Sequence, residues 1–215
     1  MPELPEVETI RRDLEERLPG KEIKKVEISK ERMVKGDSPE SLAEKLKGRK
    51  VERMQREGKI IMIELDGEEY VVIHLKMTGQ LIYQDKEELV PGGHSREEES
   101  LEEAIGGELP NKYTHVIFEF RDGSFLYFND LRQFGYIKLV SKEGMNSIRE
   151  EQGVDPLSEE FDHSYLQEVL KKRRTEIKKV LMDQKVIAGI GNIYADEILF
   201  DAGVRPDRPA HSLNE

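Results

Sequence analysis

The spacing of apolar residues changes about two thirds of the way along this 215-residue chain, and this change is the strongest constraint on its fold. Up to about residue 140, Val, Ile, Tyr and Phe gather in short runs, two pairs of which are separated by Asp-Gly. Such runs are typical of strands joined by hairpin turns. From Ser158 onward the apolar residues recur at helical spacing. The sequence therefore predicts an α+β fold with a β-rich first part and a helical second part.

The first part opens with a predicted helix, because Val7, Ile10, Leu14 and Leu18 share one helical face and Pro19-Gly20 ends it. The predicted strands cover residues 23–28, 59–65, 69–75, 79–83, 114–120, 124–128 and 135–140. Residues 85–112 interrupt this series, and we expect a long surface loop there with one helical turn at 100–104.

The second part contains two predicted helical stretches. Ser158 and Glu160 begin the first, and Ile177 lies on the stripe that extends it. A Gly-rich turn at 188–191 precedes Asn192, which we expect to cap a helix that runs to Gly203. We therefore place one domain at residues 1–140 and a second at 141–215, with the boundary segment between 141 and 157.

The formal charge of −11 argues at first against a nucleic-acid partner, but the charge is unevenly distributed. Residues 85–112 carry nine acids and three bases, whereas residues 171–185 carry seven bases and two acids. The basic run immediately precedes the Gly-rich turn, so it is a candidate phosphate-binding surface.

Cysteine is absent, which excludes disulfides, cysteine nucleophiles and thiolate zinc sites from these residues. No apolar stretch approaches the roughly 18 residues that span a bilayer, and the N-terminus has the pattern of neither a secretion signal nor a transit peptide. We expect a cytoplasmic protein with no membrane association.

The first residues, Met1-Pro2-Glu3, could carry chemistry. Removal of Met1 would expose the secondary amine of Pro2, and an α-amine with a pKa near 7.7 to 8.0 is partly unprotonated at neutral pH. Its attack on a sugar C1′ gives an iminium ion, which allows elimination of the 3′ phosphate, and Glu3 could supply a proton. The alternative is that these residues only begin a helix.

Four segments resemble the bacterial formamidopyrimidine-DNA glycosylase family. They are residues 1–10 (MPELPEVETI), 74–79 (HLKMTG), 129–135 (NDLRQFG) and 181–200 (LMDQKVIAGIGNIYADEILF). They occur in the family's order and cover nearly the whole chain apart from the acidic segment. The resemblance implies an N-terminal helix plus β-sandwich domain, followed by a helical domain with a helix-two-turn-helix element.

The resemblance also implies the activity of a bifunctional DNA glycosylase and AP lyase. Such an enzyme excises oxidised purines, including 8-oxoguanine and formamidopyrimidines, through a Schiff base on the N-terminal proline and β,δ-elimination. The implied partner is double-stranded DNA that contains oxidised bases or abasic sites, and we expect a monomer in the bacterial nucleoid. Pro2 would be the nucleophile and Glu3 the acid, assisted by Lys59.

Further residues match the family's DNA contacts. Met77, Arg132 and Phe134 match the side chains that enter the duplex when the damaged nucleotide leaves it, which suits two apolar wedges and a base-pairing Arg. The alternative puts Met77 and Phe134 in the core and Arg132 in a surface ion pair. Phosphate contacts would come from His74, Lys178 and Asn192. Glu6 and Glu197 match acids near the catalytic amine, although a structural role suits both equally.

The chain departs from the family at three points, the least of which is Lys76, where many members have Gly or Arg. Family members usually continue for some fifty to sixty residues through a four-cysteine zinc ribbon, so we expect the second domain to be incomplete and the chain to hold no metal or other cofactor. The acidic segment 85–112 is longer than in the commonest members. We place it away from the DNA, because its charge would repel the duplex.

Three other functions compete with this prediction. An endonuclease VIII-like glycosylase would share the proline chemistry but act on oxidised pyrimidines, and the run Leu4–Thr9 favours the purine branch instead. A non-catalytic homologue or fragment would bind damaged DNA without excision. An acidic interaction protein would use residues 85–112 as its contact surface.

Overall fold

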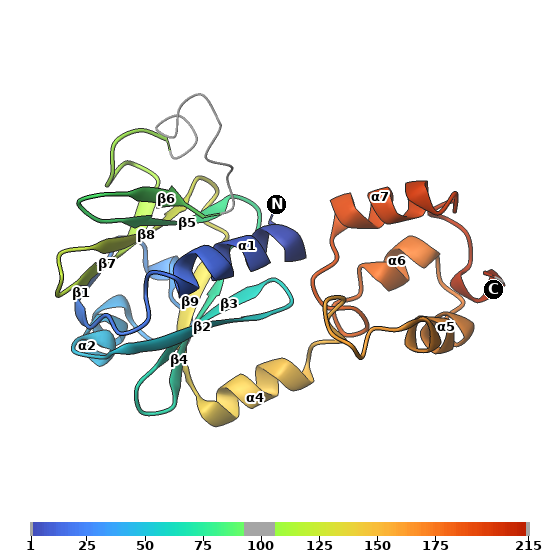
Figure 1. Ribbon diagram of the computed structural model, residues 1–215, viewed down its shortest axis with the longest axis horizontal. Coiled ribbons are helices and arrows are strands. Elements are labelled where there is room, and N and C mark those ends of the chain that lie inside the picture. The colour runs from blue at the N-terminus through green and yellow to red at the C-terminus, as the bar shows by residue number, and fades with distance from the viewer. Residues whose placement is uncertain (1, 93–105, 214–215) are drawn as a thin grey trace. The chain divides into compact units, whose positions relative to one another are not determined.

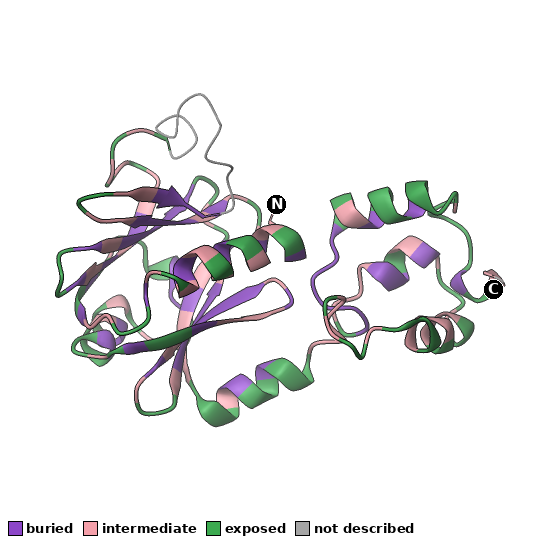
Figure 2. Cartoon of the chain, viewed as in Figure 1, coloured by how far each residue is buried: buried purple, intermediate pink, exposed green. Residues whose placement is uncertain are grey.

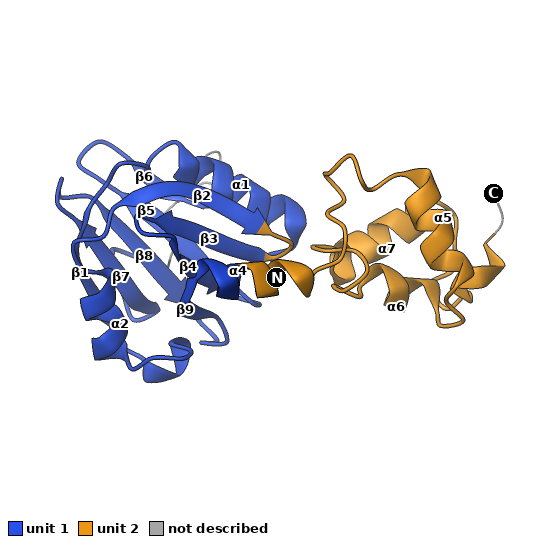
Figure 3. Ribbon diagram, turned by 90° about the horizontal axis from the view of Figure 1, so that it is seen from below, with its two compact units in different colours: residues 1–56, 60–145 blue, residues 57–59, 146–215 orange. Residues whose placement is uncertain are grey.

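The computed structural model describes residues 2–92 and 106–213, which form two compact units (Figures 1 and 3). Unit 1 comprises Met1–Arg56 and Ile60–Met145, and unit 2 comprises Glu57–Lys59 and Asn146–Glu215. The expected helical turn at residues 100–104 lies outside the described residues.

Unit 1 is built from two β-sheets. One sheet has the order β1-β7-β8-β5-β6 and the other the order β2-β3-β4-β9. The strands are β1 (Ile23–Ile28), β2 (Val51–Glu57), β3 (Ile60–Leu65), β4 (Glu69–His74), β5 (Gly79–Gln84), β6 (Leu89–Pro91), β7 (Thr114–Phe120), β8 (Phe125–Asp130) and β9 (Tyr136–Ser141). The helices are α1 (Leu4–Glu15), α2 (Pro39–Leu46) and α4 (Lys142–Glu150), which carries the chain into unit 2, with a 3-10 turn η1 (Glu31–Met33).

The main apolar core of unit 1 lies between the two sheets. It takes Ile61 and Ile73 from one sheet and Phe118 and Phe128 from the other, all of them fully buried. The apolar face of α1 closes the same core, which explains the helical spacing of Val7, Ile10 and Leu14. Figure 2 shows buried residues along the facing strands and exposed ones on the outer face of α1. The predicted helix and β-sandwich are confirmed.

Most predicted strands lie within two residues of the observed ones, but four elements were missed. β2 was missed because its only buried residues, Val51 and Met54, are spaced i and i+3. A strand with one buried face has the spacing i and i+2, which β2 lacks. α2 carried a readable signal, since the Ser38 side chain accepts a hydrogen bond from the Ser41 amide. The short strand β6 pairs with β5 inside the expected loop at 85–112, and α4 lies in the expected boundary segment.

Unit 2 is helical around a smaller apolar core. Its helices are α5 (His163–Lys171), α6 (Ile177–Leu181) and α7 (Asn192–Asp201), followed by a 3-10 turn η2 (Ala210–Ser212). The core includes Val180, Ile187, Ala195 and Leu199. The predicted start of the first helix at Ser158 was wrong, because the Asp162 side chain caps the Tyr165 amide and begins α5 at residue 163.

Two turns between α6 and α7 complete the predicted helix-two-turn-helix element. The Gln184 side chain holds them: its Nε2 donates to the carbonyls of Met182 (2.9 Å) and Ile190 (2.8 Å), and its Oε1 accepts from the Gly189 amide (2.9 Å). Gly189 has φ +96°, a conformation that favours glycine. Asn192 was expected to cap α7, but Gly191 occupies the cap position and Asn192 is the first helical residue.

Candidate functional site

The N-terminal segment presents a proline beside a buried carboxylate. Pro2 is half-buried, and Glu3 is only 1% exposed at the N-cap of α1. The Glu3 side chain accepts a hydrogen bond from the Glu6 amide, while Glu6 Oε2 accepts from the Glu3 amide at 2.8 Å. This reciprocal capping box fixes the backbone on which Pro2 stands. Glu6 therefore has a structural contact in this capping box. Its support of the catalytic amine stays a prediction.

Lys59 lies in the turn between β2 and β3, one residue before the strand in which it was expected. The preceding Gly58 is buried with φ +53°, and a Cβ placed there would lie 3.0 Å from the Gln152 side chain and 3.3 Å from the Gly189 amide. This turn therefore packs closely within unit 2, beside the two-turn element. The close packing fixes the backbone that carries Lys59.

His74 ends β4, and its ring is oriented by the chain that follows. Its Nδ1 accepts a hydrogen bond from the Lys76 amide at 3.1 Å, so a neutral ring carries its proton on Nε2. The ring lies 5.7 Å from that of Tyr136, centroid to centroid. This arrangement presents Nε2 as a donor, the role that a phosphate contact requires.

Met77, Arg132 and Phe134 form a surface cluster, called here the exposed triad. Met77 is 43% exposed, Phe134 is 53% exposed and Arg132 is exposed between them. Arg132 Nη1 lies 3.1 Å from Met77 Sδ, and its guanidinium lies 4.8 Å from the centre of the Phe134 ring. The alternative that places Met77 and Phe134 in the core is therefore excluded. Apolar side chains grouped in this way on a surface mark an interaction site.

The exposed triad stands on two loops that come from different parts of the sequence. Residues 75–78 connect β4 to β5 and carry Met77, and residues 131–135 connect β8 to β9 and carry Arg132 and Phe134. Leu131 is exposed on the second loop as well, and sequence reasoning did not single it out. It also missed the buried Asp130 at the base of this loop, although the run Asn129–Gly135 contains it.

In unit 2, α6 and α7 bring together two predicted phosphate contacts. Lys178 on α6 lies 2.7 Å from Asp196 on α7, and Asn192 Nδ2 lies 3.5 Å from the same carboxylate. Sequence reasoning missed Asp196, whose position one turn after Asn192 was the available signal. The arrangement brings the two predicted phosphate contacts together near the start of α7, where backbone amides favour an anion.

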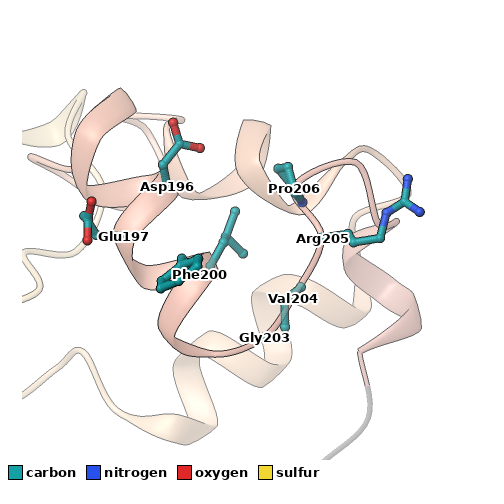
Figure 4. A pocket seen from close by; sticks show the side chains of 8 residues that line it. Asp196, Glu197, Phe200, Gly203, Val204, Arg205 and Pro206 are labelled. Carbon is teal, nitrogen blue, oxygen red and sulfur yellow. The ribbon is translucent and has the colours of Figure 1, made fainter.

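Glu197 follows Asp196 and is exposed on α7. Together with Phe200, Val204 and Pro206 it lines a hollow on this side of unit 2 (Figure 4). Its predicted place near the catalytic amine stays a prediction.

The residues present do not fit the family's zinc ribbon, because the chain has no cysteine to supply four thiolates. Within residues 2–92 and 106–213, no three His, Asp or Glu side chains gather closely enough to hold a metal ion. Across these same ranges, no helix is both long and apolar enough to cross a membrane.

Comparisons with known proteins agree with this architecture. Residues 1–137 match the formamidopyrimidine-DNA glycosylase N-terminal domain, and residues 152–215 match the formamidopyrimidine-DNA glycosylase H2TH domain. A formamidopyrimidine-DNA glycosylase of Carboxydothermus hydrogenoformans is 42% identical over the whole chain, which covers 71% of that relative. One of Moorella thermoacetica is 39% identical, and the chain covers 72% of it.

Solved structures of the Lactococcus lactis Fpg are similar as well. Its complex with DNA that contains an abasic site superposes with a TM-score of 0.81 at 30% identity, over 99% of this chain and 71% of that one. Its complex with DNA that contains N7-benzyl-Fapy-dG gives 0.82 at 31%, over 100% and 72%. The fold and the matches define an enzyme of the helix-two-turn-helix DNA glycosylase class. The chain belongs to the formamidopyrimidine-DNA glycosylase family.

Proposed function

We propose that this chain is a bifunctional DNA glycosylase and AP lyase that excises oxidised purines from duplex DNA. The observation that carries the proposal is the N-terminal Pro2 beside Glu3, a carboxylate buried at the start of α1. Its support comes from membership of a glycosylase family and from the Lactococcus lactis relative, which was solved with DNA that contains an abasic site and with DNA that contains N7-benzyl-Fapy-dG.

In the proposed reaction the amine of Pro2, exposed by removal of Met1, attacks C1′ of the damaged nucleotide. The bond from C1′ to the base breaks, and the leaving base takes a proton that Glu3 supplies. The C1′–O4′ bond then breaks as O4′ takes a proton, which opens the sugar ring and leaves an iminium ion between Pro2 and C1′. This ion acidifies C2′, so loss of a C2′ proton expels the 3′ phosphate, and a second elimination expels the 5′ phosphate. Lys59 assists the proton transfers. All these groups come from the polypeptide, and the proposed chemistry needs no metal.

The exposed triad is the proposed means of opening the duplex. A glycosylase reaches its target by turning the nucleotide out of the stack, which costs a few kcal/mol. Met77 and Phe134 would enter the vacated space as apolar wedges, and Arg132 would pair with the orphaned base. His74, Lys178 and Asn192 would hold backbone phosphates, and Glu197 would lie near the amine.

Borohydride trapping tests the chemistry directly, because the reductant converts the iminium ion into a stable crosslink. We expect the 215-residue protein to crosslink to duplexes that contain an abasic site or 8-oxoguanine opposite C, and Pro2→Gly to abolish both crosslinks. A duplex that contains thymine glycol serves as the pyrimidine control and should react more slowly.

Each other outcome changes the proposal. Preference for thymine glycol would replace oxidised purines by oxidised pyrimidines as the substrate. A crosslink on the abasic site alone would leave a lyase without base excision. Absence of any crosslink, with DNA binding retained, would indicate a protein that binds damage without catalysis.

A further inference from the structure

Asp130 is a fully buried carboxylate at the base of the loop that carries Arg132 and Phe134. It is the last residue of β8 and is 0% exposed. Its Oδ2 accepts a hydrogen bond from the Gly135 amide at 2.7 Å, and its Oδ1 accepts from the Arg132 amide at 3.1 Å and from the Thr78 hydroxyl. One side chain thus holds both ends of the 131–135 loop.

The same carboxylate ties this loop to its neighbour. Thr78 belongs to the 75–78 loop, and its Oγ1 also accepts from the Arg132 amide at 3.0 Å. Both loops contain a residue with an unfavourable left-handed backbone, Lys76 at φ +55° and Gln133 at φ +53°. Such conformations persist where the surroundings fix them. The network around Asp130 provides that fixation.

A buried histidine holds the backbone of Asp130 in place. Nε2 of His115, on β7, lies 3.0 Å from the backbone carbonyl oxygen of Asp130. Because a carbonyl oxygen can only accept a hydrogen bond, the imidazole Nε2–H donates it. Burial lowers the pKa of His115, which favours its neutral form. Gly135 also allows close approach, since a Cβ there would lie 2.6 Å from the Phe128 ring and 3.0 Å from the His74 carbonyl.

This network leaves the side chains of Met77, Arg132 and Phe134 exposed while it fixes the backbone from which they project. Ordering a loop at the moment of binding would reduce the free energy available for opening DNA, whereas a loop held in advance avoids that cost. Because Asp130 is buried beneath the loop, it acts through the backbone and not through contact with DNA.

We propose that Asp130 is a positioning residue that preorganises the exposed triad for insertion into the duplex. The proposal rests on the proposed function, in which the triad fills the space of the extruded nucleotide. It predicts that loss of the carboxylate impairs the opening of a duplex more than the proline chemistry. A purely structural role would impair both equally.

Asp130→Asn tests the proposal with almost no change in side-chain volume. In the variant, the side-chain NH₂ group faces one of the groups that donate a hydrogen bond to the carboxylate in the wild type. Two donors then face each other, and the contact becomes repulsive. We expect the ratio of 8-oxoguanine excision in duplex DNA to cleavage of a single-stranded abasic site to fall at least tenfold. Asp122→Asn is the matched control: Asp122 precedes the other end of β8 and accepts from the Ser124 amide (3.0 Å) and hydroxyl (2.6 Å). It should leave this ratio unchanged.

Fluorescence of 2-aminopurine, placed beside an abasic analogue in a duplex, reports unstacking without any chemistry. We expect binding of the wild-type protein to raise the fluorescence and Asp130→Asn to reduce that rise. If Asp130→Asn fails to fold, Thr78→Val provides a second test, because it removes the hydroxyl that bonds to Asp130 and should also reduce the fluorescence rise. Thr78→Ser keeps the hydroxyl and should give the wild-type fluorescence rise.

Equal ratios and equal fluorescence in Asp130→Asn and wild type would overturn the proposal, as would Thr78→Val behaving like wild type. These outcomes are distinct from a failure of the proposed function. In that case the wild-type protein gives no Pro2-dependent crosslink, and the fluorescence experiment still decides the role of Asp130.

Discussion

The two loops of the exposed triad and the turns between α6 and α7 are each held in place by one polar side chain, but these side chains differ in charge and burial. Both are irregular segments that carry predicted DNA contacts. In unit 1 the anchor is the fully buried carboxylate of Asp130, whereas in unit 2 it is the partly buried neutral amide of Gln184. Lys178, the basic residue of unit 2 that was predicted to hold a phosphate, is paired at the surface with Asp196.

This difference shows how burial determines how much such an anchoring side chain contributes to the free energy of unfolding. A buried polar group that loses its partner keeps the full cost of its desolvation, while a group at the surface regains water. We therefore expect the anchor in unit 1 to contribute most to stability and the surface pair in unit 2 to contribute least. Four substitutions test this order, from the largest effect to the smallest.

Asp130→Ala should lower the free energy of unfolding by about 3 kcal/mol, because the Gly135 amide and the Thr78 hydroxyl lose a fully buried charged acceptor and the Arg132 amide keeps only Thr78 Oγ1. Urea denaturation measures the change, and hydrogen exchange of the Gly135 amide should accelerate by at least a hundredfold. A loss below about 1 kcal/mol would show that water enters and replaces the carboxylate.

Gln184→Ala should cost about 1.5 kcal/mol, because three hydrogen bonds of a neutral amide are lost where solvent can partly replace them. Faster exchange of the Gly189 amide should accompany the loss. Gln55→Ala, which removes a glutamine side chain from β2, is the control and should leave the Gly189 amide unchanged. A loss as large as that of Asp130→Ala would contradict the proposed order.

Glu8→Gln should cost about 1 kcal/mol at pH 7 after allowance for screening. Burial alone would raise the pKa of Glu8, but hydrogen bonds from Arg11, Arg56 and Arg12 lower it to about 2. Since the folded pKa lies below the ordinary 4.5, this stabilisation is present above pH 4.5 and is lost as the pH falls toward 2. Urea denaturation at pH 7, 4 and 2.5 should show the two proteins converging. A difference that does not depend on pH would contradict an ionic origin.

Lys178→Ala should change stability by less than about 0.5 kcal/mol, because its pair with Asp196 is at the surface. If Lys178 holds a phosphate, the slope of log affinity for DNA against log salt should decrease by about 1. Lys179→Ala, one residue further on α6, serves as a control for net charge and should change the slope less. Equal slopes in both variants would remove Lys178 from the list of direct contacts.

The sequence by itself determined the α+β division, because a period of two and a period of 3.6 are local properties that need no partner. It placed β1 and β7 at the observed bounds and grouped Met77, Arg132 and Phe134 through a family resemblance. It did not find β2, whose two buried side chains acquire meaning only when the strand pairs in its sheet.

Tertiary structure alone decided which polar groups serve as anchors. The sequence shows Asp130 only as one acid among forty-five, and its role depends on pairing between distant segments that buries it beside Thr78 and His115. In the same way, folding places Asp196 within reach of Lys178, and packing of the helices turns Gln184 into the support of two turns. Burial and hydrogen bonding between distant residues are products of folding, so a local pattern does not encode them.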